Sequence, residues 1–208
     1  MPTHLLPIIP HNPHASVRGL ARVRAEALTW AQGRSWAWRA LVLLYVGYAG
    51  LRHVADPDYR SIFSGITFGV HELGHLVFAF FGSFLAVAGG TIAQLALPIA
   101  AGALLWSHRD YFGVTVAGGW LSMSLAEMAV YMADAREQSL TLLGFAPDPA
   151  HDWHYLLSAM GLLEQDRALA DVARLAALVL LTTSLVVGTW LCVGMARSRR
   201  GGEGAPCP

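Results

Sequence analysis

Apolar residues fall along this chain in five long blocks, with polar segments between them. The blocks run from about Trp36 to Val54, Ser61 to Phe81, Phe84 to Trp106, Tyr111 to Ala133 and Val172 to Met195. Each block is close to the roughly 20 residues that a membrane-spanning helix needs. The third is interrupted by Gly89-Gly90 and by Pro98, so it is either a spanning helix or a partly re-entrant one. The pattern predicts an all-α transmembrane bundle of about five or six membrane helices.

The polar segments define the domain organisation that we expect. Residues 1–35 form a cytoplasmic or interfacial N-terminal segment, in which residues 1–15 are unstructured. Residues 16–35 carry four arginines and form either a basic helix on an anionic membrane face or a solvated stub. Residues 36–196 form the integral membrane domain, and residues 197–208 form a disordered tail.

The longest polar segment, residues 134–171, contains a predicted short helix. Asp148-Pro149 combines a good N-cap residue with a proline at the first helical position. Beyond it, apolar residues recur at i, i+3, i+4 and i+7 along one helical face: Trp153, Leu156, Leu157 and Met160. This amphipathic helix is too short to span a bilayer, so we place it at the interface or against the bundle.

Composition narrows the class of protein. Of the 208 residues, 55% are hydrophobic and 13% are charged, against about 25% charged in an ordinary soluble domain. The formal net charge is zero, so no nucleic-acid partner is indicated. The two cysteines, Cys192 and Cys207, match neither a disulfide framework nor a thiolate zinc site. We expect a multi-pass protein of a bacterial inner (cytoplasmic) membrane, in direct contact with the lipid bilayer.

The arginines leave the topology open. Those before the first block favour a cytoplasmic N-terminus, because cytoplasmic segments carry an excess of positive charge. Five spans would then place the last three arginines outside, against the same tendency: Arg197, Arg199 and Arg200. Either the glycine-containing third block is partly re-entrant, or residues 151–163 dip into the bilayer.

Candidate chemistry lies inside the second block, where residues 71–75 read HELGH. His71 and His75 are four residues apart, so on a helix they share a face and can bind one zinc ion. Glu72 follows the first of these ligands, where its carboxylate can accept a proton from an activated water. His71 is about 15 Å along a helix from Ser61, near the middle of a bilayer. The alternative is a polar cluster satisfied by hydrogen bonds between helices.

A catalytic zinc ion takes three protein ligands and keeps one open position. Asp134, at the end of the fourth block, is the leading third ligand, unless it is a helix-end residue in the headgroup zone. Glu127 lies seven residues earlier on the same face and is expected beside the substrate or a ligand. Three residues of the polar segment are alternative ligands: His151, Asp152 and His154. The other interpretation is that they are headgroup-facing polar residues of an amphipathic helix that Trp153 anchors at the interface.

At this point the chain resembles the intramembrane zinc metalloproteases of the site-2 protease class, over about residues 61–135. Residues 71–75 match the HExxH of that family, and residues 90–94 have the spacing of its GPxxN element, with threonine for proline and Gln94 for asparagine. Asp134 stands where the family has its third ligand, without the flanking residues of the family pattern. With no accessory domain, this is a minimal and divergent version.

The resemblance implies hydrolysis of peptide bonds within the bilayer. Glu72 would be the general base, Gln94 would lie near the substrate or its oxyanion, and the Zn²⁺ ligands would be His71, His75 and Asp134. The substrate would be a membrane protein or peptide. Two other functions stay open: a non-catalytic membrane protein with a structural metal site or adaptor role, and a haem-binding membrane protein.

Overall fold

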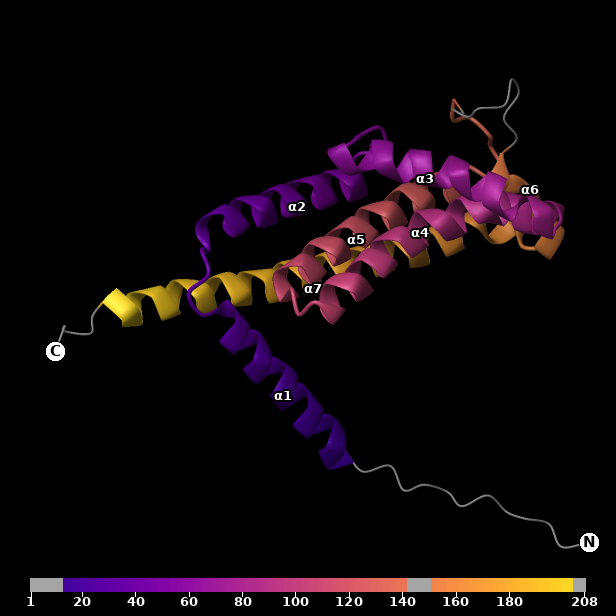
Figure 1. Ribbon diagram of the computed structural model, residues 1–208. Coiled ribbons are helices and arrows are strands. Elements are labelled where there is room, and N and C mark those ends of the chain that lie inside the picture. The colour runs from indigo at the N-terminus through magenta and orange to yellow at the C-terminus, as the bar shows by residue number, and fades with distance from the viewer. Residues whose placement is uncertain (1–12, 142–150, 204–208) are drawn as a thin grey trace, which may run out of the picture.

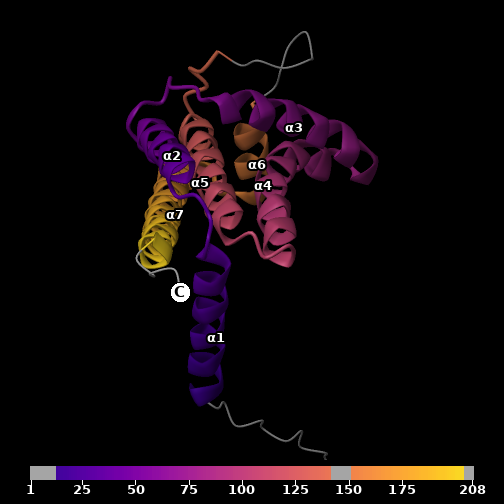
Figure 2. The same cartoon turned by 60° about the vertical axis from the view of Figure 1, so that its left-hand side comes forward.

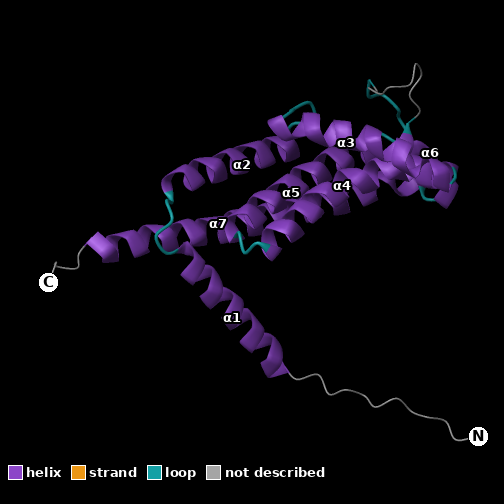
Figure 3. Cartoon of the chain, viewed as in Figure 1, coloured by secondary structure: helices purple, strands orange, loops and turns teal. Residues whose placement is uncertain are grey.

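The computed structural model describes residues 13–141 and 151–203, which form seven α-helices and two 3-10 turns without a strand (Figures 1 and 3). The all-α prediction is confirmed for this part of the chain. The elements are α1 (Pro13–Ala31), α2 (Ala37–Ala55), α3 (Ile62–Phe78), η1 (Ala79–Phe81), α4 (Ser83–Ser107), α5 (Tyr111–Ala133), α6 (Asp152–Met160), η2 (Leu163–Gln165) and α7 (Asp166–Glu203).

Three stretches of the described helices are long and apolar enough to cross a membrane: Ile62–Phe81, Ser83–Ser107 and Leu163–Arg199. The first and fourth predicted blocks do form helices, α2 and α5, but neither meets the same criterion of length and hydropathy. Arg39 and Arg52 lower the hydropathy of α2, and α5 carries several glycines and serines together with Glu127. Five or six spans therefore do not follow from helix composition alone.

Helix α4 runs without a break through both interruptions of the third predicted block. Gly89 and Gly90 are helical because they face α3 at very short range: a Cβ at Gly74 would lie 2.2 Å from the Gly89 carbonyl oxygen. Pro98 is also inside α4 and is buried. The glycines serve close helix packing here, as small residues do between membrane helices, and do not mark a re-entrant turn.

Helix α5 lies at the centre of the bundle, with α2, α4 and α7 along its sides (Figures 1 and 2). Midway along α5, Ser122 Oγ donates a hydrogen bond of 2.7 Å to the Ala177 carbonyl of α7. Two apolar clusters lie at opposite ends of this helix pair. One joins Tyr111 and Leu191 to α1, and the other joins Met132 and Ala170 to α6.

Three predicted boundaries are corrected. The short amphipathic helix, α6, begins at Asp152 with His151 as its N-cap, whereas Asp148-Pro149 lies outside the described residues. Helix α7 continues to Glu203, so the first part of the predicted disordered tail is helical. The N-terminal helix, α1, begins at Pro13, inside the stretch predicted to be unstructured, and packs its C-terminal end against α7 through Ala27 and Ala31.

Candidate metal centre

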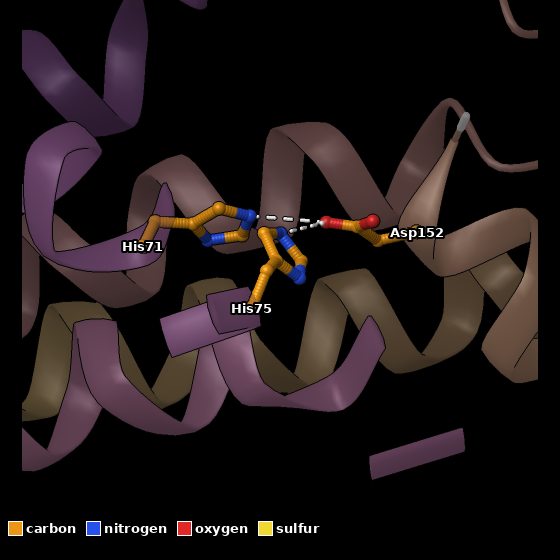
Figure 4. A group of neighbouring side chains, drawn as sticks. All are labelled: His71, His75 and Asp152. Carbon is orange, nitrogen blue, oxygen red and sulfur yellow. Dashed lines mark hydrogen bonds and ion pairs between the residues drawn. The ribbon is translucent and has the colours of Figure 1, made fainter. Parts of the chain in front are cut away.

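Helix α3 presents the two histidines of the HExxH sequence on one face, as the four-residue spacing predicts. Their ring centroids are 4.8 Å apart. The Nε2 atoms of His71 and His75 lie 3.0 Å and 3.2 Å from the same atom, Oδ2 of Asp152 (Figure 4). These three side chains form the group of described residues that could hold a metal ion, with their ligand atoms all within 4.8 Å of one another.

The other ring nitrogen of each histidine is hydrogen-bonded to an oxygen. His71 Nδ1 lies 3.0 Å from Gln94 Oε1, and His75 Nδ1 lies 2.9 Å from the Ala86 carbonyl oxygen of α4. Gln94 Nε2 donates to the Ser124 carbonyl, which keeps Oε1 turned toward His71. Since an oxygen acceptor requires an N–H on Nδ1, both imidazoles offer Nε2 to a metal.

Gly90 of α4 forms one wall of this pocket. A Cβ at this position would lie 2.6 Å from Nε2 of both His71 and His75. The pocket therefore exists because α4 has no side chain there, and because Gly74 and Gly89 allow the two helices to approach.

Asp152 reaches the histidines from the start of α6. Its backbone N–H donates to the Tyr131 hydroxyl at 2.9 Å, and the Tyr131 ring lies against His151 with centroids 4.3 Å apart. Burial raises the pKa of the Asp152 carboxyl, but hydrogen bonds from His71 and His75 outweigh burial and leave this pKa below its ordinary value. An ionised carboxylate is the form that binds a metal.

Asp134, the predicted third ligand, is not brought to the histidine pair. It is the C-cap of α5, and its carboxylate accepts hydrogen bonds from the Ser139 N–H, the Ser139 hydroxyl and the Leu140 N–H. Burial raises the pKa of Asp134, yet these bonds outweigh burial, so the net shift is downward. Local capping at the end of the helix uses this carboxylate, and Asp152, one of the predicted alternatives, takes the place beside the imidazoles.

The other two predicted alternatives also point elsewhere. His151 caps α6, with Nδ1 accepting from the His154 N–H at 3.2 Å and Nε2 lying 3.4 Å from Asp134 Oδ2. His154 Nδ1 lies 2.8 Å from the Ala135 carbonyl oxygen. Both histidines therefore tie α6 to the end of α5, beside the metal group rather than in it.

Glu127 belongs to a different cluster from the one predicted. The Ser64 hydroxyl donates to Glu127 Oε1 at 2.6 Å, and His53 Nδ1 lies 3.7 Å from the same oxygen. Ser64 also accepts from the Ser61 N–H in the capping box that begins α3. Glu127 thus holds the start of α3 rather than the histidine pair.

Glu72 is half-buried on α3, one residue after His71. It is close enough to His75 and to the Tyr131 hydroxyl to interact electrostatically with both. This side of the pocket therefore carries a carboxylate in addition to that of Asp152.

No protein-family model, curated protein or solved structure matches this chain.

Sequence reasoning missed three contributors to this centre. Nothing in the sequence distinguishes Tyr131 from the other aromatic residues of its helix. The contact from Ala86 is made by its backbone carbonyl, so the residue type does not reveal it. Gly90 was visible, but as a helix interruption. Gln94 was found through the family resemblance, and the structure places its carbonyl on His71, where it orients a ligand.

Proposed function

We propose that the chain is a membrane-embedded, zinc-dependent metallopeptidase that hydrolyses peptide bonds in or near the bilayer. One observation carries the proposal: Nε2 of His71, Nε2 of His75 and the Asp152 carboxylate converge, while both Nδ1 atoms are held by oxygen acceptors.

The donor set fits zinc. Two imidazoles and one carboxylate, with two histidines spaced four residues apart on a helix, are a common ligand set for catalytic zinc. The group contains three residues in the part of the chain that the structure describes, and three ligands leave one coordination position for substrate or water. The open wall at Gly90 supports the same reading, since it leaves space in front of both Nε2 atoms.

Each residue then has a distinct task. A bound zinc ion supplies Lewis-acid activation of water and of the scissile carbonyl. Glu72 accepts the proton of the attacking water and returns it to the leaving amine. Gln94 and the Ala86 carbonyl hold the imidazoles in the orientation and tautomer that ligation requires.

The outer surface of the helices supports a membrane setting with several spans. Large apolar side chains of α3 and η1 point away from the bundle, among them Leu73, Leu76 and Phe80, the last 91% exposed. A continuous apolar surface of this kind is unfavourable in water and is matched by lipid. Together with the three apolar stretches, it supports insertion of the bundle in a bilayer.

The proposal is tested with purified full-length protein reconstituted in lipid vesicles. Zinc content is measured by mass spectrometry, and cleavage is followed with a pool of quenched fluorescent peptides. Wild type is expected to hold one zinc ion and to cleave. Glu72→Gln is expected to keep zinc and lose cleavage by at least about 10²-fold, whereas Glu164→Gln, at an exposed surface carboxylate, keeps both. A wild type without zinc, or a fully active Glu72→Gln, would overturn the proposal.

A further inference from the structure

The arginines of both chain ends gather at one end of the bundle. Ala27 and Ala31 of α1 pack against Leu191 and Met195 near the end of α7. The turn between α4 and α5 lies beside them, since Arg109 reaches Glu26 of α1 at 3.2 Å. Basic residues from four parts of the chain therefore share this surface: Arg22, Arg24, Arg34, Arg39, Arg109, Arg197 and Arg199. Glu26 and Asp110 are acidic side chains that face them.

Tryptophans gather on the same surface. Trp30 and Trp106 both pack edge-on against Tyr111, with centroids 5.9 Å and 5.6 Å away. Arg34 lies 4.3 Å from the Trp30 ring, and Arg39 lies 4.2 Å from the Trp38 ring. Aromatic side chains with a polar edge concentrate where a bilayer meets water, and arginines there contact lipid phosphates.

We infer that this arginine–tryptophan surface, formed by the residues just named, binds the phosphate headgroups of anionic lipids and faces the cytoplasm. Positive charge exceeds negative charge on it, as expected for a cytoplasmic face. At the other end of the bundle acidic side chains outnumber the arginines of the same segments: Asp134, Glu137, Asp152, Glu164, Asp166 and Asp171 against Arg136, Arg167 and Arg174.

The path of α3 allows both chain ends to lie on one side. Its first turn contacts α5 at Met123, through Ser61 Oγ, and its last turn contacts α4 at Gly89, through Phe78. These contacts are about 18 Å along α5 from Tyr111 and about 25 Å along α4 from Trp106. Helix α3 therefore begins near the middle of the bundle and ends at its far end, away from the arginine–tryptophan surface.

Four crossings then remain, made by α2 and α3 together, by α4, by α5 and by α7, because the end of α2 meets the start of α3 midway along α5 through His53 and Ser61. An even number places α1 and the end of α7 on the same side, as their direct packing requires. The conflict between five spans and the C-terminal arginines disappears, because α2 and α3 make one crossing between them.

The metal centre consequently lies beyond the bilayer midplane, on the side away from the cytoplasm. Gln94 is about 18 Å along α4 from Trp106, and Ser124 is about 20 Å along α5 from Tyr111, within a hydrocarbon core of about 30 Å. This placement of the metal centre depends only on the inferred lipid-binding surface. The expectation that substrate peptide bonds are cleaved in the outer half of the bilayer depends also on the proposed peptidase function.

Cysteine labelling tests the sidedness without reference to zinc or cleavage. The background carries Cys192→Ala and Cys207→Ser, and a single cysteine is placed at Gln32→Cys, after α1, or at Gln165→Cys, before α7; both positions are exposed. A membrane-impermeant maleimide is expected to label Gln165→Cys in intact cells and Gln32→Cys only after lysis. Labelling of both from one side, or of Gln32→Cys alone in intact cells, overturns the inference.

Lipid binding is tested by quenching of tryptophan fluorescence in phosphatidylcholine vesicles that carry a minor fraction of brominated lipid. Brominated phosphatidylglycerol is expected to quench more strongly than brominated phosphatidylcholine. The triple variant Arg24→Gln/Arg34→Gln/Arg197→Gln is expected to reduce that preference roughly threefold or more. A matched triple away from this surface, Arg52→Gln/Arg60→Gln/Arg167→Gln, leaves it unchanged. Equal quenching by the two lipids in wild type, or equal effects of the two triples, contradicts the assignment.

Discussion

Gly90 lies directly against the imidazole of His75, so close that a Cβ at position 90 would stand 2.6 Å from Nε2. The backbone of α4 is therefore part of the pocket wall, although it contributes no side chain there. The same α4 segment supplies the Ala86 carbonyl that orients His75. The metal pocket is a property of the α3–α4 contact, and its contents depend on how closely these two helices approach.

Gly90→Ala is expected to abolish metal binding. The added methyl group would occupy the space in front of both Nε2 atoms, where a metal ion at about 2.0–2.1 Å from nitrogen must sit. Zinc content of the purified variant, measured by mass spectrometry, gives the result. Gly102→Ala in the same helix is the control, since its Cβ would make only an ordinary contact of 3.5 Å with Ala117. Full zinc content in Gly90→Ala would show that the metal does not bind between these imidazoles.

Asp152→Ala is expected to lose zinc, because this carboxylate is the third donor beside the two histidines. Loss of a residue that only hydrogen-bonds to a ligand lowers metal affinity about 10–100-fold, and loss of a ligand itself is expected to lower zinc affinity at least as much. Competition with a chromogenic chelator measures the change. His154→Ala is the matched control on the same helix, since its ring faces the Ala135 carbonyl. If Asp152→Ala keeps wild-type affinity and His154→Ala does not, the ligand assignment is wrong.

Asp134→Asn is expected to keep zinc and to lower stability by about 1–2 kcal/mol, because an amide nitrogen in place of Oδ2 would face the Leu140 N–H. Folding lowers the pKa of Asp134, so its hydrogen bonds stabilise the fold at neutral pH. That contribution disappears as pH falls from about 3.9 through the lowered pKa of the folded protein. Between pH 5 and pH 3 the variant should accordingly lose less stability than wild type, as measured by thermal unfolding. Loss of zinc in Asp134→Asn would restore this residue as a ligand.

The helices and the histidine pair could be predicted from sequence because both follow from short-range patterns. The apolar blocks predict α2, α3, α4, α5 and α7, and the four-residue spacing on a helix predicts that His71 lies beside His75. The carboxylate that lies beside this pair, that of Asp152, could not be predicted in this way. Its position depends on where the chain returns after residue 141. That return is fixed by Tyr131 of α5, which contacts the His151 ring and the Asp152 N–H at the start of α6.

Gly89 and Gly90 were misread for a related reason. A glycine lowers helix propensity, so two in a row favour an interruption when only the local sequence is considered. Packing against Gly74 reverses that preference, since the same absence of Cβ lets α3 and α4 approach. Partners distant in sequence decide both features: Asp152 rather than Asp134 lies beside the histidines, and the two glycines continue a helix.

Gln94→Leu is expected to weaken zinc affinity about 10–100-fold while leaving the zinc stoichiometry at saturation unchanged. Leucine fills a similar volume but cannot accept the hydrogen bond that orients His71. The control is Thr91→Val, one turn earlier in α4, because the Thr91 hydroxyl is buried without a hydrogen-bond partner. Chelator competition on both variants separates orientation of the ligand from general repacking. Equal affinity in the two variants would mean that Gln94 does not act through His71.

Gly74→Ala is expected to destabilise the protein by about 1–3 kcal/mol, the range found for overpacking. Its Cβ would lie 2.2 Å from the Gly89 carbonyl oxygen, and backbone atoms at a helix contact cannot move aside as a flexible side chain can. Gly69→Ala lies on the same helix and provides the control, since nothing lies within 4 Å of its Cβ. Replacing glycine by alanine in a helix otherwise stabilises it, by about 0.5–1 kcal/mol, so the two variants should shift in opposite directions. Thermal unfolding in detergent measures both; a stabilised Gly74→Ala would contradict the close approach of α3 and α4 on which the metal pocket depends.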